Sequence, residues 1–301
     1  MKKNIICFII VCLFVSVCIG AVVIVIFQKE GKIEDISGKI LLDDPLAYSA
    51  DRFQGLALLD PTTGTVTPLN INSTCAKFMK NSSGVIVEGS KRIEMVDWET
   101  GKIDVVYTST VEVIDLKTGK TDVVYTSTSD WVFPIKFIAY VDEEYISVVD
   151  ESTLYLVNIL DGTKRVFDIS SDHSWTGDGK KLYYSKAKIY EFNIETEETR
   201  ELFDGSYPQI SKDGSKLAYY ESGTDVLIVK DLKSGEEWKH NNLVKKFCFS
   251  PDGKYVATIE YWRGIGVYLG DTVKIWDYEN DVVQIVIPKY AGESFYIDWA
   301  E

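Results

Sequence analysis

The chain has 301 residues, of which 46% are hydrophobic and 13% aromatic, and a formal net charge of −14 at pH 7. This amount of apolar side chain is enough to fill a folded core and excludes a disordered chain. The acidic balance, without a basic stripe in the sequence, excludes a protein that binds nucleic acid, because phosphate backbones attract clustered Lys and Arg.

The first predicted element is a transmembrane helix at residues 5–27. This segment has no charged side chain, and at about 1.5 Å per residue it is long enough to cross a hydrocarbon core of roughly 30 Å. Two lysines precede it, whereas the charges that follow nearly cancel. The positive-inside rule therefore places residues 1–4 in the cytoplasm and the rest of the chain, after a linker at 28–36, on the extracytoplasmic side.

Two other interpretations of this segment are a cleavable signal peptide and a lipid anchor on Cys18. A signal peptide has a shorter apolar core and a small-x-small cleavage site, but here the apolar run continues beyond Ala21. The residue before Cys18 is Val, which is large for a lipoprotein site. A signal anchor that stays in the cell membrane is therefore the favoured interpretation.

From residue 37 to residue 301 one pattern repeats: an apolar strand, an Asp or Asn, a short polar segment that usually contains Gly, and a second strand. Its seven occurrences are marked by Asp60, Asp97, Asp115, Asn158, Asn193, Asp231 and Asp277. An Asp or Asn side chain can form a hydrogen bond with the backbone two residues later in the chain, and Gly adopts a positive φ without steric cost. Each occurrence therefore predicts a β-hairpin. Most marks recur at roughly 35 to 45 residues, which is typical of the four-stranded blades of a β-propeller.

A second hairpin signal, a tight Gly turn between two strands, precedes three of these marks at 174–185, 209–220 and 248–259. We expect these hairpins to supply the two inner strands of a blade. A blade then consists of a strand, a Gly turn, a strand, a variable loop, a strand, an Asp turn and a fourth strand.

The interval between Asp97 and Asp115 is too short for a blade. Residues 95–112 and 113–130 match at 11 of 18 positions, including DVVYTST in both, which indicates that one hairpin has been duplicated in tandem. We expect the copy to form an extra hairpin or a loop at the rim of the second blade. The prediction is then an all-β, six-bladed propeller, with seven blades as the alternative.

The two ends of the propeller are expected to meet. The first blade, at 37–44, begins with its second strand, and 294–301 provides a spare strand at the end of the chain. Pairing these segments would close the ring and protect its sheet edges. Cys75 and Cys248 lie in apolar stretches of different predicted blades, so we expect packed thiols rather than a disulfide.

Three Gly turns carry a family resemblance. The segments SPDGKY at 250–255, SKDGSK at 211–216 and TGDGKK at 176–181 resemble the WD40-like repeats of TolB-like six-bladed propellers, and the resemblance covers 36–301. It implies an extracytoplasmic binding scaffold or a propeller attached to a peptidase. True WD40 repeats are less similar, because the Gly-His that opens them is missing. TolB also has an N-terminal α/β domain, for which this chain leaves no space, so a TolB role is not implied.

The sequence contains no nucleophile elbow, Walker loop, dinucleotide fingerprint, HExxH helix or EF-hand loop. The polar segment 168–173 holds Ser, Asp and His, but a catalytic triad needs these groups on separate elements, so we interpret the segment as a loop between blades. No catalytic residue, metal site or cofactor is predicted.

A partner-binding face is predicted from the strand order. Connections between blades, and between the second and third strands of a blade, should gather around one end of the central channel. The connection at 260–271 is the longest and is rich in residue types that dominate binding hot spots. The candidate residues on these connections are Tyr48, Arg52, Trp131, His173, Tyr261, Trp262, Arg263 and Tyr268. The alternative is that the aromatic side chains only pack over the channel mouth.

The sequence thus predicts a single-pass membrane protein whose extracytoplasmic propeller binds a protein or peptide without catalysis. One alternative is a lactonase-like hydrolase with carboxylates or a metal in the channel. Another is a purely structural protein of the cell surface.

Overall fold

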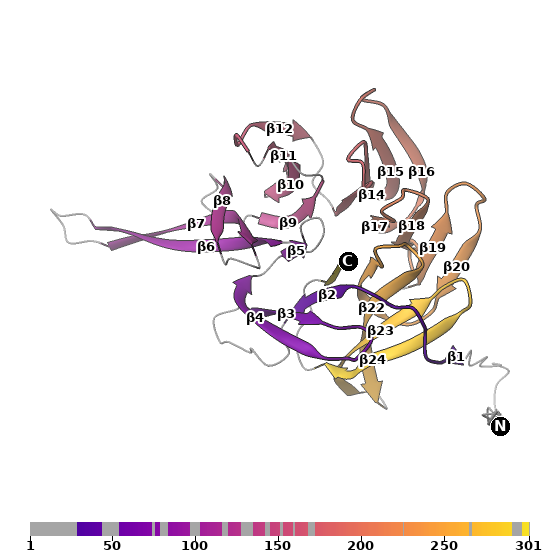
Figure 1. Ribbon diagram of the computed structural model, residues 1–301. Helices are drawn as coiled ribbons and strands as arrows, with labels where there is room; N and C mark the ends of the chain where they lie inside the picture. Colours follow the sequence, from indigo (N-terminus) through magenta and orange to yellow (C-terminus); the bar gives the residue numbers. More distant parts are fainter. Residues whose placement is uncertain are drawn as a thin grey trace.

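The computed structural model describes residues 29–43, 54–73, 76–78, 84–96, 103–115, 120–127, 135–141, 145–150, 153–158, 160–167, 172–224, 226–264, 267–290 and 297–300. The predicted transmembrane segment, 5–27, lies outside these residues. Within them, no helix has the length and apolar character needed to cross a membrane. The described elements are β-strands (Figure 1).

The strands form six sheets, numbered here in chain order. Sheet 1 contains β25 (Ile297–Ala300), β2 (Lys39–Asp43), β3 (Gln54–Leu59) and β4 (Val66–Ser73). Sheet 2 contains β5 (Ala76–Phe78), β6 (Gly84–Val96), β7 (Ile103–Asp115) and β8 (Thr121–Thr126). Sheet 3 contains β9 (Ile135–Tyr140), β10 (Tyr145–Asp150), β11 (Thr153–Asn158) and β12 (Lys164–Phe167).

The second half of the chain continues the same order. Sheet 4 contains β13 (His173–Trp175), β14 (Lys181–Lys186), β15 (Lys188–Asn193) and β16 (Thr199–Asp204). Sheet 5 contains β17 (Ser206–Ile210), β18 (Lys216–Tyr220), β19 (Leu227–Asp231) and β20 (Glu237–His240). Sheet 6 contains β21 (Val244–Phe249), β22 (Tyr255–Gly264), β23 (Val267–Asp277) and β24 (Val282–Tyr290), with β1 (Lys29–Glu30) at its outer edge.

The sheets are arranged around a central axis. The first strand of each sheet, which we call its inner strand, contacts the inner strands of the neighbouring sheets, in the order β25, β5, β9, β13, β17, β21 and back to β25. The fold is therefore an all-β propeller, as predicted. Among the described strands, five sheets have the four strands of a propeller blade, and the sixth has a fifth strand, β1.

Hydrophobic cores lie between neighbouring sheets, so the middle strands are covered on both faces. In β10 the five residues from Ile146 to Asp150 are all buried, whereas the first three residues of the outer strand β12 are exposed. This is why the middle strands are continuous apolar runs rather than alternating ones. Cys248 is a buried free thiol, as predicted, and burial raises its pKa; Cys75 lies outside the described residues.

The C-terminal strand completes sheet 1, which confirms the predicted closure. In β25, Trp299 lies opposite Ile40 and Ile297 opposite Leu42 of β2. Asp298 accepts a hydrogen bond from the backbone N–H of Phe78, at 2.8 Å, on the inner strand of sheet 2. The last strand of the chain therefore joins sheet 1 to sheet 2.

The turns have the chemistry that the repeat predicts. At the Gly turn of sheet 6, the Ser250 hydroxyl donates to Asp252 at 2.7 Å and accepts from the Tyr255 N–H at 3.0 Å, while Gly253 has a φ of 71°. The same arrangement of a side-chain hydroxyl, an Asp and a Gly recurs at 176–179 and 211–214. At the Asp turns, the marker side chains at 60, 158, 193 and 231 each accept the backbone N–H two residues on.

The duplicated segment lengthens the hairpin of β6 and β7, which agrees with the hairpin and not with the loop among the two predicted alternatives. β6 and β7 pair along their whole length, from Gly84 opposite Asp115 to Val96 opposite Ile103, and extend from the ring as a long arm (Figure 1). β8 pairs only with the ring end of β7. Corresponding residues of the two copies pair in the same strand register. Val96 lies opposite Ile103 in the arm, and the equivalent residues of the second copy, Ile114 and Thr121, lie opposite each other in sheet 2.

This shared register predicts that either copy can be removed. Deleting 95–112, or instead 113–130, should leave one complete set of third and fourth strands in sheet 2. We expect each deletion to change the free energy of unfolding by no more than about 1 kcal/mol, because loop length itself has a small cost. Deleting 95–130 removes both copies and should abolish cooperative unfolding. Circular dichroism during urea denaturation distinguishes these outcomes, and failure of both single deletions to fold would contradict the interpretation.

The expected linker, 28–36, contacts the propeller from residue 29 onward. β1 pairs in parallel with β24, with Lys29 opposite Val282. Farther along, the Ile33 N–H donates to the Gln284 side chain at 2.8 Å. Ile33 and Ile36 are buried in the core between sheets 6 and 1. We call residues 29–36 the N-terminal strap; it bridges the first and last sheets on the outside of the ring.

Candidate functional site

The propeller has two chemically different ends. Because neighbouring strands in each sheet are antiparallel, connections alternate between the ends. The tight turns between first and second and between third and fourth strands lie at one end, the turn face. Connections between second and third strands, and from one sheet to the next, lie at the other end, the loop face. The predicted partner site belongs to the loop face.

The segment 260–271, predicted as a loop, is a β-hairpin instead. β22 continues to Gly264 and β23 starts at Val267, and Arg263 lies opposite Tyr268. The prediction was wrong because aromatic and β-branched residues on both sides of a Gly-containing turn favour strand pairing over a loop. Trp262 pairs in the same hairpin. Trp262, Arg263 and Tyr268 therefore lie on extended backbone that continues beyond the rest of sheet 6.

Tyr261 lies at the base of this hairpin, and its side chain is exposed. The Lys245 ammonium is 4.5 Å from the centre of the Tyr261 ring, which is the geometry of a cation–π contact. The same ammonium lies 2.8 Å from the carboxylate of Asp271, which is completely buried. A buried carboxylate is stable only when it is paired, so Asp271 fixes Lys245, and Lys245 supports the exposed ring.

A second set of charged groups lies beneath the hairpin, where sheet 5 meets sheet 6. Glu260 is 2.7 Å from His240 Nε2 and 2.7 Å from Lys274 Nζ, and it accepts the Thr258 hydroxyl at 2.9 Å. Burial by itself raises the pKa of Glu260, but the hydrogen bond from His240 and the charge of Lys274 outweigh burial and lower that pKa. The carboxylate is therefore ionised at neutral pH and joins the two sheets.

Polar side chains also gather at the loop-face ends of three inner strands. Asp172 directly precedes β13, Tyr207 is on β17, and Lys246 is on β21. Tyr207 is exposed and has a φ of 55°, and the Lys246 ammonium is 6.0 Å from its ring centre. Burial raises the pKa of Asp172, and the positive charge of Lys246 acts against this increase. The mouth of the channel at sheets 4 to 6 thus offers an aromatic ring, a cation and an acid.

Of the remaining sequence candidates, the structure describes only His173. Tyr48, Arg52 and Trp131 are outside the described residues. His173 is on β13 rather than in a loop, and its side chain is fully buried, with Nε2 2.6 Å from the Ser147 hydroxyl. This contact joins sheet 4 to sheet 3.

Sequence reasoning missed Lys245, Lys246, Asp271 and Glu260. The available signal was a charged residue within or next to an apolar strand, as in VATIE and VKKFCF. Such a residue has to be paired when its strand is buried. Its partners, however, come from other strands, so the sequence alone does not identify them.

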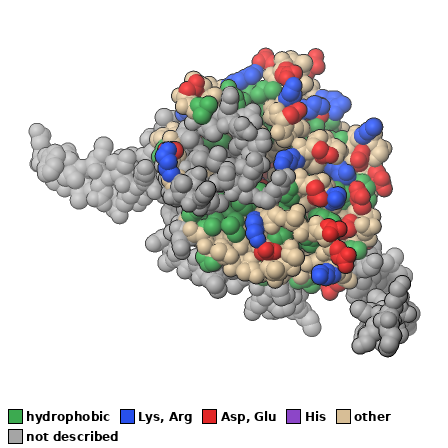
Figure 2. Space-filling model, in the orientation of Figure 1, with side chains coloured by type: hydrophobic (Ala, Val, Ile, Leu, Met, Phe, Trp, Pro, Cys, Tyr) green, Lys and Arg blue, Asp and Glu red, His purple; other side chains and the backbone are tan. Residues whose placement is uncertain are grey.

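One face of the described part of the molecule is mixed in charge. On the face seen in Figure 2, acidic and basic side chains are interspersed over the described part of the molecule. Among the described residues, no group of three or more His, Cys, Asp or Glu is placed to hold a metal ion.

No protein-family model matches the sequence, and no curated protein is significantly similar to it. Several solved structures are similar in fold. A chain of a nidogen–laminin complex is 12% identical with a TM-score of 0.62, and the match covers 88% of this chain and 99% of that one. A functionally unknown protein from Desulfotomaculum acetoxidans is 13% identical with a TM-score of 0.54, covering 88% and 100%. A putative 6-phosphogluconolactonase from Bacteroides uniformis is 15% identical with a TM-score of 0.50, covering 85% and 83%. At these identities the likeness establishes the fold alone.

Proposed function

We propose that this protein is a single-pass membrane protein with a TolB-like, six-bladed propeller on the extracytoplasmic side, and that the loop face binds a protein or peptide partner without catalysis. In this proposal each of the six sheets is one blade. The observation that carries it is the β22–β23 hairpin, which extends from the loop face and has the exposed, supported ring of Tyr261 at its base.

The hairpin has the composition and support of a binding element. Tyr, Trp and Arg are enriched among residues that dominate protein interfaces, and the hairpin carries all three types at 261–263. Sites on paired strands are held more precisely than sites on loops. The buried Asp271–Lys245 pair and the Glu260 cluster would hold the base of the hairpin in place when a partner binds.

The N-terminal strap favours an outward-facing site. β1 starts two residues after the predicted transmembrane helix ends and pairs with the turn-face end of β24, at Val282. A membrane helix that ends there would place the turn face on the membrane side, because little chain remains between helix and sheet. The loop face would then point away from the membrane, toward partners outside the cell membrane.

The fold comparisons are compatible with such a role. One similar chain comes from a nidogen–laminin complex, which is an assembly of proteins. The likeness to a putative 6-phosphogluconolactonase motivates keeping the lactonase-like hydrolase as the competing function. The same preparation of protein can test both.

The test is capture from native membranes with the full chain in mild detergent as bait. A variant with Tyr261→Ala, Trp262→Ala and Arg263→Ala should lose a partner that the parent retains, with at least a roughly tenfold weaker association, because hot-spot truncations each cost about 2 kcal/mol or more. The matched control is Leu160→Ala, which removes an exposed apolar side chain from the turn face. A partner lost equally by the control contradicts the loop-face site. Absence of a partner together with about one retained divalent ion would favour the hydrolase.

A further inference from the structure

A pocket opens between sheets 3 and 4 at the turn face, far from the proposed partner site. Its volume is about 510 Å³, within the range of small-molecule sites. In the ring, the boundary of sheets 3 and 4 is the one farthest from the boundary of sheets 6 and 1, where the strap is attached. The pocket therefore lies across the ring from the strap, on the face that the proposed attachment turns toward the membrane.

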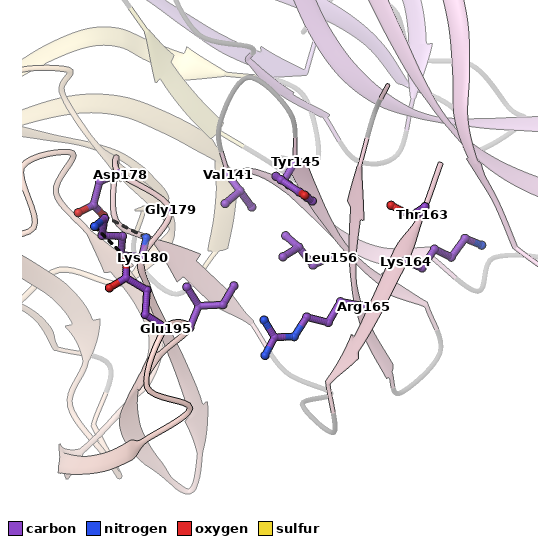
Figure 3. A pocket seen from close by; sticks show the side chains of 11 residues that line it. Val141, Tyr145, Leu156, Thr163, Lys164, Arg165, Asp178, Gly179, Lys180 and Glu195 are labelled. Carbon is purple, nitrogen blue, oxygen red and sulfur yellow. Dashed lines mark hydrogen bonds and ion pairs between the residues drawn. The ribbon is translucent and has the colours of Figure 1, made fainter. Parts of the chain in front are cut away.

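The floor of the pocket is apolar. Val141 and Leu156 from sheet 3 are buried, and the partly buried Tyr145 and Ile194 pack against the same core. The side chains of sheet 3 and those of sheet 4 face each other across the open space (Figure 3). A ligand that fills this space therefore needs an apolar body.

The rim carries charges of both signs. Arg165 reaches from β12 into the space between the sheets, and Lys180 lies on the opposite side (Figure 3). The third cation of the lining, Lys164, has its ammonium 4.0 Å from the centre of the Tyr125 ring, on the side of sheet 2. Arg165 and Lys180 are therefore the cations available to a ligand.

The acids of the rim leave these two cations weakly engaged. Asp178 accepts the Thr176 hydroxyl at 2.6 Å and the Lys180 N–H at 3.1 Å, so its carboxylate is used within its own turn. Lys180 pairs with Glu195 at 2.8 Å, but both side chains are more than half exposed. Arg165 pairs with Glu197, also at the surface. Exposed ion pairs contribute little, so a ligand carboxylate can replace them at small cost.

We propose that this pocket binds an apolar molecule that ends in a carboxylate, with Arg165 and Lys180 holding the carboxylate and the Val141–Leu156 floor holding the apolar part. Arg165 suits this role because a guanidinium binds a carboxylate through two parallel hydrogen bonds. Its position 5.1 Å from the Phe167 ring restrains the side chain before the ligand arrives. Two sources share this chemistry: the C-terminus of an apolar peptide and a fatty acid.

The experiment uses the full chain in lipid nanodiscs and isothermal titration calorimetry, with empty nanodiscs as the blank. The probes are N-acetyl-leucyl-leucine and octanoate, each compared with its amide. We expect at least one carboxylate to bind, and its amide to bind at least about tenfold more weakly, because a charge-assisted pair is lost. Binding of the dipeptide or of octanoate identifies the source.

Two variants complete the test. Arg165→Gln should weaken binding of the carboxylate at least about tenfold. Arg200→Gln removes an exposed arginine of β16 that does not line the pocket, and it should leave binding unchanged. No binding of either carboxylate, equal binding of acid and amide, or equal binding by the parent and Arg165→Gln would each overturn the proposal.

Discussion

Replacing Trp299 by Ala is expected to lower the free energy of unfolding by about 3–5 kcal/mol, the cost typical of removing a buried large aromatic side chain. Trp299 is 7% exposed and packs in the core between sheets 6 and 1, together with Ile33 and Ile36 of the strap. Its indole N–H donates to the Ser37 carbonyl at 2.9 Å. The substitution would thus weaken the C-terminal strand and the strap at once.

The substitution acts on the closure of the ring as well as on the core, because β25 is the strand that completes sheet 1. The backbone approaches so closely here that a Cβ on Gly38, whose φ is 91°, would lie 2.2 Å from the Ala300 carbonyl oxygen. The control is Trp299→Phe, which keeps most of the apolar volume and should cost clearly less. Urea denaturation followed by far-ultraviolet circular dichroism measures both variants. Equal stability of Trp299→Ala and the parent would contradict the role of β25 in closure.

The fold could be predicted from the sequence because its local signals and its global arrangement agree. The Asp and Gly turns have local physical causes, so Ser250, Asp252 and Gly253 identify a turn without any knowledge of the rest of the chain. The closure by β25 could be predicted because the first blade lacks a strand and the chain ends in a spare one. The duplicated hairpin was visible as sequence identity.

The candidate site could be predicted only in part. The location of the aromatic segment at 261–263 follows from the blade pattern. Its strand pairing, however, depends on cross-strand partners such as Tyr268, and the spacing of the repeat does not identify these partners. The buried ions depend on contacts between sheets: His240 is on β20 and Lys274 on β23, and both contact Glu260. The strap was predicted as a linker because its two buried side chains, Ile33 and Ile36, lie among charged residues.

Replacing Glu260 by Gln is expected to lower the free energy of unfolding at pH 7 by about 3 kcal/mol. The Glu260 side chain is 3% exposed and is the shared partner of His240 and Lys274. Gln keeps the shape but has one oxygen instead of two and no charge, so it leaves a buried cation without a counter-ion, which typically costs about 3–5 kcal/mol. The control is Glu221→Gln, whose partner Lys239 is at 2.9 Å at the surface, and which should cost less than about 1 kcal/mol.

The pH dependence separates this electrostatic role from simple packing. The pKa of Glu260 is lower in the folded state than its ordinary value of 4.5. Such a carboxyl group contributes stability that is present above pH 4.5 and is lost as the pH falls through the folded pKa. Gln does not titrate, so the difference between parent and Glu260→Gln should be largest near pH 7 and should shrink below pH 4.5. A difference that stays constant from pH 7 to pH 3 would mean that shape, and not charge, makes Glu260 important at the junction that supports the loop-face hairpin.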